Sequence, residues 1–443
     1  MASPSRLLLA YVGDDFTGST DALEFLGRAG LKAALFLEPP SPETLRRYEG
    51  LQAIGVAGLT RSLPPGPMEA ALRPAFHALA ALGPAHVHYK VCSTFDSSPA
   101  VGSIGRAIEV GREVFQSQSV PLLVAAPALG RYCLFGHLFA RMGIGSTGEI
   151  YRLDRHPSMS RHPVTPADES DLRLHLGRQT ALRVGLVDLL AVAGTVDQVR
   201  AQRDAVVAAG AEVVLYDAFD AGHLARIGAV LDGDREAGAT RFSVGSSGIE
   251  MALGQAWTSA GIARPVHDWP DPGTCQPLLV VSGSCSPVTA GQIDQALAAG
   301  FACVAVDVVA AAEGWDNASE AQTMLAALRE GRSVVVHTSR GEVARGIAAA
   351  ESARLGARLG RLAKMAVESA GVRRVLLAGG DSSSQAARAL GLESMEMIAP
   401  LAPGAPLCRA RAPGSPVDGL EVNFKGGQVG AADYFDAVRR GKL

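Results

Sequence analysis

Three aspartates lie within eight residues near the start of the sequence. Asp14 and Asp15 directly follow the apolar run Leu7–Val12, and Asp21 comes six residues later, with Thr17 between them. Carboxylates at the end of a strand can bind a cation, take a proton from a hydroxyl or hold a polyol. Helix capping and turn formation are the ordinary alternative for Asp and Thr. The density of acidic and hydroxyl groups in this segment favours a functional site.

A second polar segment begins at Lys90, at the end of another apolar run. Lys90 offers a positive charge to a carboxylate or phosphate. Ser93 and Thr94 offer hydroxyls and Asp96 offers an acceptor, which together suit an anionic ligand with many hydroxyls. The alternative is a helix start rich in Ser and Thr. Cys92 is not expected to act as a nucleophile, because no base adjoins it.

A basic, proline-interrupted loop spans Arg152–Pro166 and contains Arg161 and His162. The loop could recognise a substrate carboxylate within its own subunit or from the second subunit of a homodimer. A solvated linker is an equally weighted alternative.

Three glycine-rich turns follow strand-like runs in the second half of the chain. Backbone N–H groups in such turns bind anions, and small side chains let a phosphate approach. The turns are Ser282–Pro287, Gly379–Ser384 and Lys425–Gly430, and Lys425 could close over phosphates. Asp381 could hold Mg²⁺ or a ribose. Two turns that open helices in one domain favour a nucleotide over either turn alone.

Two other patterns carry less weight. Gly143–Gly148 matches G-x-G-x-x-G, but Leu138–Met142 before it does not look like a buried strand, and the strand–turn–helix context is missing. His86 and His88 share one face of a strand, as a metal pair would. With no third ligand in sight, they are interpreted as surface or packing histidines.

Short apolar runs alternate with longer amphipathic segments along most of the chain, which predicts parallel sheets flanked by helices. Residues 261–277 interrupt this alternation with four prolines and read as a linker. We therefore predict an α/β protein of two domains, residues 1–260 and 278–443. In the second, a helix is expected near Glu342–Ala370, and Ile398–Arg411 and Leu420–Phe424 look like short strands joined by proline and glycine turns.

Composition narrows the functional class. The 443 residues are 48% hydrophobic and 19% charged, with a formal net charge of −3. Near-neutral charge argues against nucleic-acid binding, and no apolar stretch is long enough to predict a membrane span. The six cysteines show no C-x-x-C spacing, which argues against a zinc site or a redox dithiol. Sparse cysteines without a pattern favour a cytoplasmic protein.

Taken in order, these segments resemble the four-carbon acid sugar kinases over almost the whole chain. The motifs that carry the resemblance are DDFTGSTD at 14–21, Thr60-Arg61-Ser62, KVCSTFDSS from Lys90, RHPVTP from Arg161, VGSSGIEMALGQAW from Val244, VSGSCSPVT from Val281 and AGGDSS from Ala378. The resemblance implies a sugar-acid-binding N-terminal domain, a nucleotide-binding C-terminal domain, and an active site in the cleft between them. It also implies ATP and Mg²⁺ as cofactors and a small sugar acid as substrate.

The expected reaction is phosphorylation of a terminal hydroxyl. The CSTFDSS form resembles members that phosphorylate 3-oxo-tetronates at O4, and RHPVTP is similar to relatives that act on 3-oxo-isoapionate. D-threonate and D-erythronate are further candidates. The last loop departs from the family's K-S-G-N-F-G, because it reads KGGQVG from Lys425. A metal-dependent sugar-acid aldolase and a sugar-acid sensor are the alternatives outside the kinase class.

Each site residue then has an expected role. Asp15, with Asp14 as the alternate, is the expected base. Arg61 and Lys90 are expected to hold the substrate carboxylate. The further substrate-binding candidates are Thr17, Asp21, Ser93, Thr94, Asp96, Arg161 and His162. The resemblance also implies ATP contacts at Ser284, Gly379, Gly380, Asp381, Ser382 and Gly427. Asp381 is the expected residue for Mg²⁺.

Overall fold

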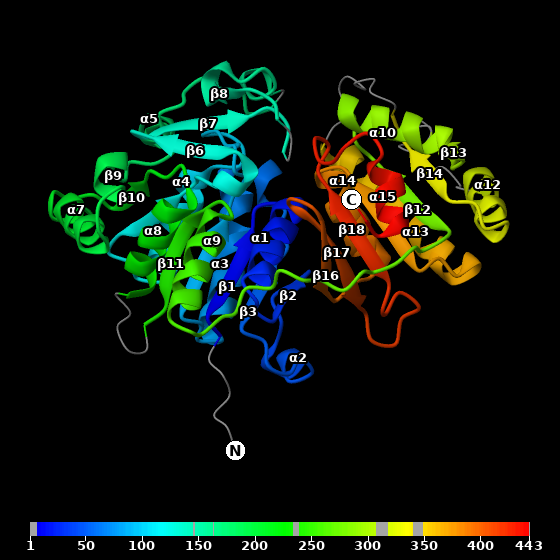
Figure 1. Ribbon diagram of the computed structural model, residues 1–443, viewed down its shortest axis with the longest axis horizontal. Helices are drawn as coiled ribbons and strands as arrows, with labels where there is room; N and C mark the ends of the chain where they lie inside the picture. Colours follow the sequence, from blue (N-terminus) through cyan, green and yellow to red (C-terminus); the bar gives the residue numbers. More distant parts are fainter. Residues whose placement is uncertain are drawn as a thin grey trace. The chain divides into compact units, whose positions relative to one another are not determined.

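The computed structural model describes residues 7–144, 147–162, 164–233, 239–306, 318–339 and 349–442. The chain divides into two compact units (Figure 1). The first comprises Met1–Ala34 and Glu38–His267, and the second comprises Leu35–Leu37 and Asp268–Leu443. Each unit is built on a sheet with helices against it, so the predicted α/β class is confirmed.

The large sheet of the first unit has the order β2-β3-β1-β4-β11-β5-β10-β9, and the pairs from β3 to β9 are parallel. Its strands are β1 (Leu9–Gly13), β2 (Ala33–Phe36), β3 (Ala53–Val56), β4 (His86–Lys90), β5 (Val120–Leu123), β9 (Val184–Val187), β10 (Val213–Tyr216) and β11 (Arg241–Gly245). The carboxyl ends of parallel strands share one edge of the sheet, where ligands of such folds bind.

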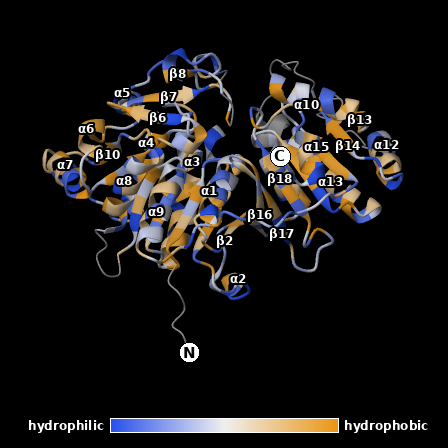
Figure 2. Cartoon of the chain, in the orientation of Figure 1, coloured by the Kyte–Doolittle hydropathy of each residue, from blue (hydrophilic) through white to orange (hydrophobic). Residues whose placement is uncertain are grey.

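Helices of the first unit pack on this sheet and on one another. They are α1 (Phe16–Arg28), α2 (Pro42–Leu45), α3 (Pro65–Ala81), α4 (Ile104–Val114), α5 (Leu172–Gly177), α6 (Leu189–Val192), α7 (Val196–Ala208), α8 (Ala221–Gly233) and α9 (Gly248–Ser259), with short 3-10 turns η1 (Thr60–Ser62), η2 (Pro127–Leu129), η3 (Leu153–Arg155) and η4 (Met159–Arg161). The helix α9 contacts both α1 and α8, while α3 contacts α4. Figure 2 shows hydrophobic colouring along the sheet strands and mixed colouring on the helices, as burial of one helix face requires.

A second, antiparallel sheet in the first unit was not expected from the sequence. It consists of β6 (Arg131–Leu134), β7 (His137–Arg141) and β8 (Ile150–Arg152). The segment 138–142, which did not look like a buried strand in the sequence, falls mostly within the half-buried strand β7. Only alternate residues of β7 are buried, so its sequence lacks the continuous apolar run of a parallel strand. After Gly143–Gly148, of which 145–146 lie outside the described residues, the next element is the strand β8 rather than a helix.

The second unit has a sheet in the order β13-β14-β12-β15-β18-β17-β16. Its elements are β12 (Leu278–Ser282), α10 (Pro287–Ala298), β13 (Ala302–Ala305), α12 (Ala318–Arg329), β14 (Val334–His337), α13 (Ala349–Ala370), β15 (Arg374–Ala378), α14 (Asp381–Leu390), β16 (Ser394–Ala402), β17 (Ala405–Arg411), β18 (Glu421–Lys425) and α15 (Tyr434–Arg440). Strands from β13 to β18 in this order are parallel, whereas β17 pairs antiparallel with both β18 and β16.

The short strands expected over Ile398–Arg411 and Leu420–Phe424 correspond to β16, β17 and β18, and the chain reverses between β16 and β17 at Gly404, which has φ of 80°. Of the helix expected over Glu342–Ala370, residues 342–348 lie outside the described residues, and the remainder forms α13. No helix in the described ranges combines the length and apolarity needed to span a membrane.

Candidate active site

Five neighbouring strands of the first unit, β3, β1, β4, β11 and β5, carry polar side chains at their carboxyl ends or in the loops that follow. The residues contributed in this order are Arg61, Asp14 with Asp15, Lys90, Ser247 and Arg131. These five segments are far apart in the sequence, and the parallel sheet brings them to one edge. All except Arg131 and Ser247 were singled out from the sequence.

Asp14 and Asp15 share a single arginine. Arg61 donates from Nε and Nη2 to both carboxylate oxygens of Asp14 at 3.0 and 2.7 Å, and from Nη1 to Asp15 Oδ2 at 2.6 Å. Asp15 also caps α1, because its Oδ1 accepts from the Gly18 amide at 2.6 Å and its Oδ2 from Thr17 Oγ1 at 2.8 Å. Both carboxylates are buried.

The two carboxylates differ as bases. Burial raises the pKa of Asp14, and the neighbouring Asp15 raises it further, while Arg61 opposes both effects; the net direction is upward. For Arg61, burial lowers the pKa, but the charges of Asp14 and Asp15 more than offset that and raise it. Asp15 is engaged by three donors, whereas Asp14 is engaged by Arg61 alone among side-chain contacts of the described residues. Asp14 is therefore the less saturated acceptor of a proton.

Lys90 and Asp21 form a second buried ion pair beside this cluster. Lys90 Nζ lies 3.2 Å from Asp21 Oδ2 and donates to the Val91 carbonyl at 3.0 Å. Ser247 Oγ, from the turn before α9, donates to the same Asp21 oxygen. A Cβ added at Gly18 would lie 2.6 Å from Asp15 Oδ1 and 3.3 Å from Lys90 Nζ, so a side chain at Gly18 would separate the two charged groups.

The two histidines on β4 also form buried pairs with carboxylates. His86, His88 and Lys90 alternate along one face of the strand, as residues two apart do. His86 Nε2 lies 3.0 Å from Asp232 Oδ1, and His88 Nδ1 lies 2.6 Å from Glu250 Oε1. Both histidines are buried and paired, which agrees with packing rather than with a metal pair.

Sequence reasoning missed the carboxylates that partner these histidines. Asp232 lies in α8 and Glu250 in α9, 146 and 162 residues away from their partners. Glu250 stands inside the motif VGSSGIEMALGQAW, so a buried acid within an otherwise apolar helix was the available signal.

The Ser- and Thr-rich segment after β4 folds into a hydrogen-bonded turn. Thr94 Oγ1 donates to Asp96 Oδ1 at 2.9 Å, and Cys92 Sγ lies 2.9 Å from Thr94 Oγ1. Burial raises the pKa of Cys92 to about 11, which agrees with the prediction that it is not a nucleophile. Ser93 is buried in the same turn.

Part of the basic loop reaches this turn. Thr165 and Ala167 line a small cavity together with Thr94, Asp96 and His175. Arg161 is exposed, and His162 Nδ1 accepts from the Thr165 amide at 3.0 Å. The structure thus brings the end of the RHPVTP segment to Asp96, while the contacts of Arg161 and His162 among the described residues are local.

In the second unit, the three predicted glycine turns meet at the carboxyl ends of β12, β15 and β18. The Gly283 amide donates to the Ala378 carbonyl and the Gly379 amide to the Lys425 carbonyl, each at 3.0 Å. A Cβ at Gly283 or at Gly379 would collide with Ser382. Only glycine fits these approaches, and Gly379 has φ of 143°, which a side chain disfavours.

The last loop is held by a buried lysine. Lys425 Nζ donates to Thr289 Oγ1 at 3.0 Å, and Thr289 Oγ1 donates to the Gly427 carbonyl at 3.0 Å. A Cβ at Gly427 would lie 2.9 Å from Ser284 Oγ, so this loop and the β12 turn are in contact. Burial lowers the pKa of Lys425 to about 7.

These contacts bring together Ser284, Gly379, Ser382, Lys425 and Gly427 of the predicted nucleotide residues. Gly380 directly precedes α14 and its carbonyl accepts from Ser383 Oγ at 2.8 Å. Asp381 begins α14, but its side chain lies outside the described residues. Backbone amides at the start of α14 and small side chains around them make a site suited to phosphates.

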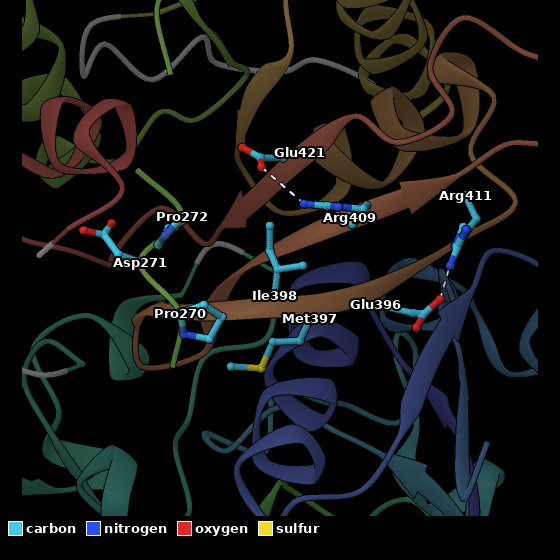
Figure 3. Close-up of a pocket in the computed structure, with 9 residues that line it drawn as sticks. All are labelled: Pro270, Asp271, Pro272, Glu396, Met397, Ile398, Arg409, Arg411 and Glu421. Carbon is cyan, nitrogen blue, oxygen red and sulfur yellow. Dashed lines mark hydrogen bonds and ion pairs between the residues drawn. The ribbon is translucent and has the colours of Figure 1, made fainter. Parts of the chain in front are cut away.

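A separate pocket of about 380 Å³ lies on the second unit (Figure 3). Met397 and Ile398 of β16 face it, as do residues of the 270–272 segment. Its charged side chains are already paired, since Arg411 Nε lies 3.2 Å from Glu396 and Arg409 lies 3.6 Å from Glu421. The pocket contains none of the predicted site residues, and its charges offer no unpaired group to a ligand.

The fold and the two clusters define a class of protein: an α/β protein with a charged site on one parallel sheet and glycine-rich phosphate-binding turns on another. Comparison with known proteins agrees with this class. The model of a sugar-binding N-terminal domain matches residues 9–253, and that of a nucleotide-binding C-terminal domain matches residues 279–435.

Characterised relatives match over the full length. The chain is 43% identical to a 3-oxo-isoapionate kinase of Paraburkholderia graminis, covering 100% of this chain and 96% of the relative. It is 32% identical to a 3-oxo-tetronate kinase of Methylobacterium radiotolerans, covering 97% and 98%. The chain therefore belongs to the four-carbon acid sugar kinase family, and its activity is that of a carbohydrate-acid kinase.

Two solved structures share the fold. A Salmonella typhimurium LT2 protein described as a tRNA synthase matches with a TM-score of 0.76 and 23% identity, over 99% of this chain and 100% of that one. The Haemophilus influenzae protein HI1011 matches with a TM-score of 0.69 and 22% identity, over 96% and 98%. At these identities the likeness concerns the fold alone.

Proposed function

We propose that this kinase transfers the γ-phosphoryl group of ATP to the terminal hydroxyl of a small 3-oxo sugar acid. The first candidate substrate is 3-oxo-isoapionate, and the second is a 3-oxo-tetronate phosphorylated at O4. The observation that carries the order is the 43% identity to a 3-oxo-isoapionate kinase along the whole chain, against 32% for a 3-oxo-tetronate kinase. D-threonate and D-erythronate follow as simpler acids. We also propose a cytoplasmic location, where ATP is available.

The acceptor is proposed to bind at the carboxyl edge of the first unit's sheet. Asp14 is the better of the two candidate bases, because its pKa is raised and Arg61 is its one side-chain partner among the described residues. As Asp14 takes the proton from the terminal hydroxyl, that oxygen forms a bond to the γ-phosphorus and the bond to the ADP oxygen breaks. Asp15, which caps α1, is proposed to hold Arg61 in position.

ATP is proposed to bind at the glycine turns of the second unit. The open space at Gly380, where no atom lies within 4 Å of the position of an added Cβ, supports this, because phosphate oxygens can approach backbone amides only where no side chain intervenes. Mg²⁺ in kinases is bound mainly through phosphates with few protein ligands, and the hydroxyls of Ser284 and Ser382 beside the turns suit such a site. Asp381, whose side chain lies outside the described residues, is proposed from the sequence alone. When bound, Mg²⁺ neutralises charge on the phosphates.

The first experiment is coupled ADP release with Mg-ATP against a panel of acids. The panel holds 3-oxo-isoapionate, the two 3-oxo-tetronates, D-threonate and D-erythronate. We expect release with 3-oxo-isoapionate at a kcat/KM at least about tenfold above the others, because one misplaced branch in a shaped pocket discriminates by that order. If the enzyme prefers a 3-oxo-tetronate, that acid takes the place of 3-oxo-isoapionate as the proposed substrate, and the proposed reaction stands. Absence of release with every acid would reject the proposed function.

We also propose that the protein forms a homodimer through an apolar surface of the first unit. Phe135 and Leu190 are 50% and 73% exposed, and Phe219 is 43% exposed. Asp217, two residues before Phe219, accepts hydrogen bonds from the backbone amides of Phe135 and Leu189, so the segments that carry the three side chains adjoin. Phe135 has φ of 52°, a strained value for a bulky residue, which the bond to Asp217 stabilises. Exposed apolar side chains on adjoining segments favour self-association.

Light scattering during size exclusion tests the dimer. We expect the wild-type protein to elute at twice the mass of 45.8 kDa and the double variant Phe135→Asp/Leu190→Asp to elute as a monomer. Charges placed at the centre of an apolar interface are desolvated without partners, which should weaken association about 100-fold or more. A wild-type protein that elutes as a monomer when loaded at about 50 µM would contradict the proposed homodimer. A double variant that still elutes as a dimer would contradict the proposed interface.

A further inference from the structure

Arg131 is a buried arginine whose guanidinium has no carboxylate partner among the described residues. It begins β6, in the loop that follows the carboxyl end of β5, and is 6% exposed. Its Nη1 donates to the carbonyls of Leu129, Gly130 and Arg141 at 3.1, 3.3 and 3.0 Å. Its Nε is buried and has no hydrogen-bond partner among the described residues. The side chain is thus held firmly, with donor capacity left unused.

The other cations of the proposed acceptor site are already neutralised. Arg61 is bonded to Asp14 and Asp15, and Lys90 is paired with Asp21. In contrast, no Asp or Glu of the described ranges lies within 4.0 Å of Arg131. A buried charge without a counter-ion is unfavourable in the free protein, and an anion that binds beside it supplies the missing partner.

Contacts at the strand ends place the segment of Arg131 beside the acceptor site. The Arg131 backbone pairs with Ala126, shortly after β5, and Ser246 Oγ, next to Ser247, donates to the Val124 carbonyl at 2.7 Å. Burial lowers the pKa of Arg131, and the opposing influences come first from Cys92 and Asp96 and then from Asp21. These three residues belong to the turn after β4 and to α1, which are the segments that hold the other acceptor-site groups. The pKa of Arg61 moves in the opposite direction, upward, because two carboxylates outweigh its burial. Arg61 therefore already has carboxylate partners in the free protein, whereas Arg131 has none among the described residues.

We propose that Arg131 binds the carboxylate of the sugar acid, and that Arg61 serves mainly to hold Asp14 and Asp15. A guanidinium matches a carboxylate with two parallel N–H···O bonds, and the free Nε is one of the donors that such a pair uses. This inference deepens the proposed function and rests on it for the identity of the anion. It revises the expectation that Arg61 and Lys90 hold the substrate carboxylate.

The test compares Arg131→Gln with Arg141→Gln. Arg141 is the matched control, because it lies on the neighbouring strand β7 and its Nη1 donates to the Gly148 carbonyl rather than to a carboxylate. The readouts are KM and kcat for the best acid of the panel, and the rise in melting temperature caused by that acid or by D-erythronate without ATP. Erythritol, which has the same chain without a carboxylate, is the neutral probe.

We expect Arg131→Gln to raise KM for the acid about tenfold or more and to lose the acid-induced rise in melting temperature, since one partner of a buried charge pair is removed. The rise caused by Mg-ATP should stay, as should both rises in Arg141→Gln. Erythritol should not raise the melting temperature of any of the three proteins. An unchanged KM and unchanged acid-induced rise in Arg131→Gln would overturn the proposal, and so would equal losses in the two variants.

Two further outcomes separate this inference from the proposed function. If an acid binds in a way that depends on Arg131 but no ADP is released, the carboxylate site at Arg131 stands and the proposed phosphorylation of that acid is wrong. Neither binding nor release with any acid would reject both. If Arg131→Gln does not fold, Arg131→Lys decides instead: it keeps the charge but loses the planar pair of donors, so KM should rise with little change in kcat. A lowered melting temperature with an unchanged KM in Arg131→Lys would assign Arg131 a purely structural role.

Discussion

Asp14→Asn is expected to lower kcat about 1,000-fold, within the usual range for loss of a general base. The substitution keeps the size of the side chain and removes its ability to take the hydroxyl proton. Mg-ATP should raise the melting temperature of the variant as it does that of the wild type, because the nucleotide residues lie in the second unit. Single-turnover phosphoryl transfer and thermal shift with Mg-ATP are the two measurements.

Asp15→Asn is the matched control for this prediction. Asn caps helices about as well as Asp, so α1 should keep its start and Gly18 its hydrogen bond. We expect this variant to retain at least about ten times the kcat of Asp14→Asn, since a positioning role costs less than loss of the base. The reverse order would make Asp15 the base, as first expected from the sequence, and full activity in both would exclude the pair.

The pH profile offers an independent check on Asp14. A base must be deprotonated, so kcat/KM falls as pH drops through its pKa. Burial, assisted by the charge of Asp15, holds the pKa of Asp14 above its ordinary value of 3.8. The acid limb should therefore lie above pH 4 in the wild type, and an acid limb at or below pH 4 would argue against Asp14.

The main sheets could be predicted from the sequence because parallel strands are buried on both faces. Runs such as Leu278–Ser282 and Arg374–Ala378 are apolar almost throughout and coincide with β12 and β15. The sheet β6-β7-β8 could not be predicted in this way. Its strands are short and bury alternate residues, so their pattern is weaker than that of a parallel strand.

The candidate site could be predicted where one segment carries several functional groups. The 14–21 segment and the turn after Lys90 each concentrate acidic and hydroxyl residues, and the structure joins them through the Lys90–Asp21 pair. Single residues whose meaning depends on distant partners were missed. Ser247 binds Asp21 across 226 residues of sequence, and the isolation of Arg131 from carboxylates is visible only in three dimensions. No local pattern encodes such relations.

Lys425→Met is expected to weaken Mg-ATP binding about 100-fold, because a buried amine that faces the phosphate turns loses its charge. In the free protein, burial lowers the pKa of Lys425 to about 7. Bound phosphates favour the charged amine, so ATP binding above pH 7 should take up a proton. Titration calorimetry at pH 8 in phosphate and in Tris should show uptake approaching one proton per ATP in the wild type and none in the variant.

Stability of the ligand-free protein should respond to pH through the same group. The unfolded chain keeps the ordinary Lys pKa of 10.5, so between pH 7 and 10.5 it binds more protons than the folded chain. The free energy of unfolding therefore rises with pH across this window, and the cost of the buried charge is fully present below pH 7. Lys425→Met should accordingly melt above the wild type at pH 6, and the gap should narrow toward pH 9.

Thr289→Val separates the charge of Lys425 from its role in holding the loop. The variant loses the hydroxyl that links Lys425 Nζ to the Gly427 carbonyl but retains the amine. If the charge acts on the phosphates, this variant should still take up a proton on binding ATP and should lose less affinity than Lys425→Met. Equal losses in both variants, without proton uptake in the wild type, would show that Lys425 acts only by fixing the loop. In that case the phosphates would be bound by the backbone amides at Gly379 and Gly427 without a neighbouring cation, and ATP affinity would be insensitive to pH between 7 and 9.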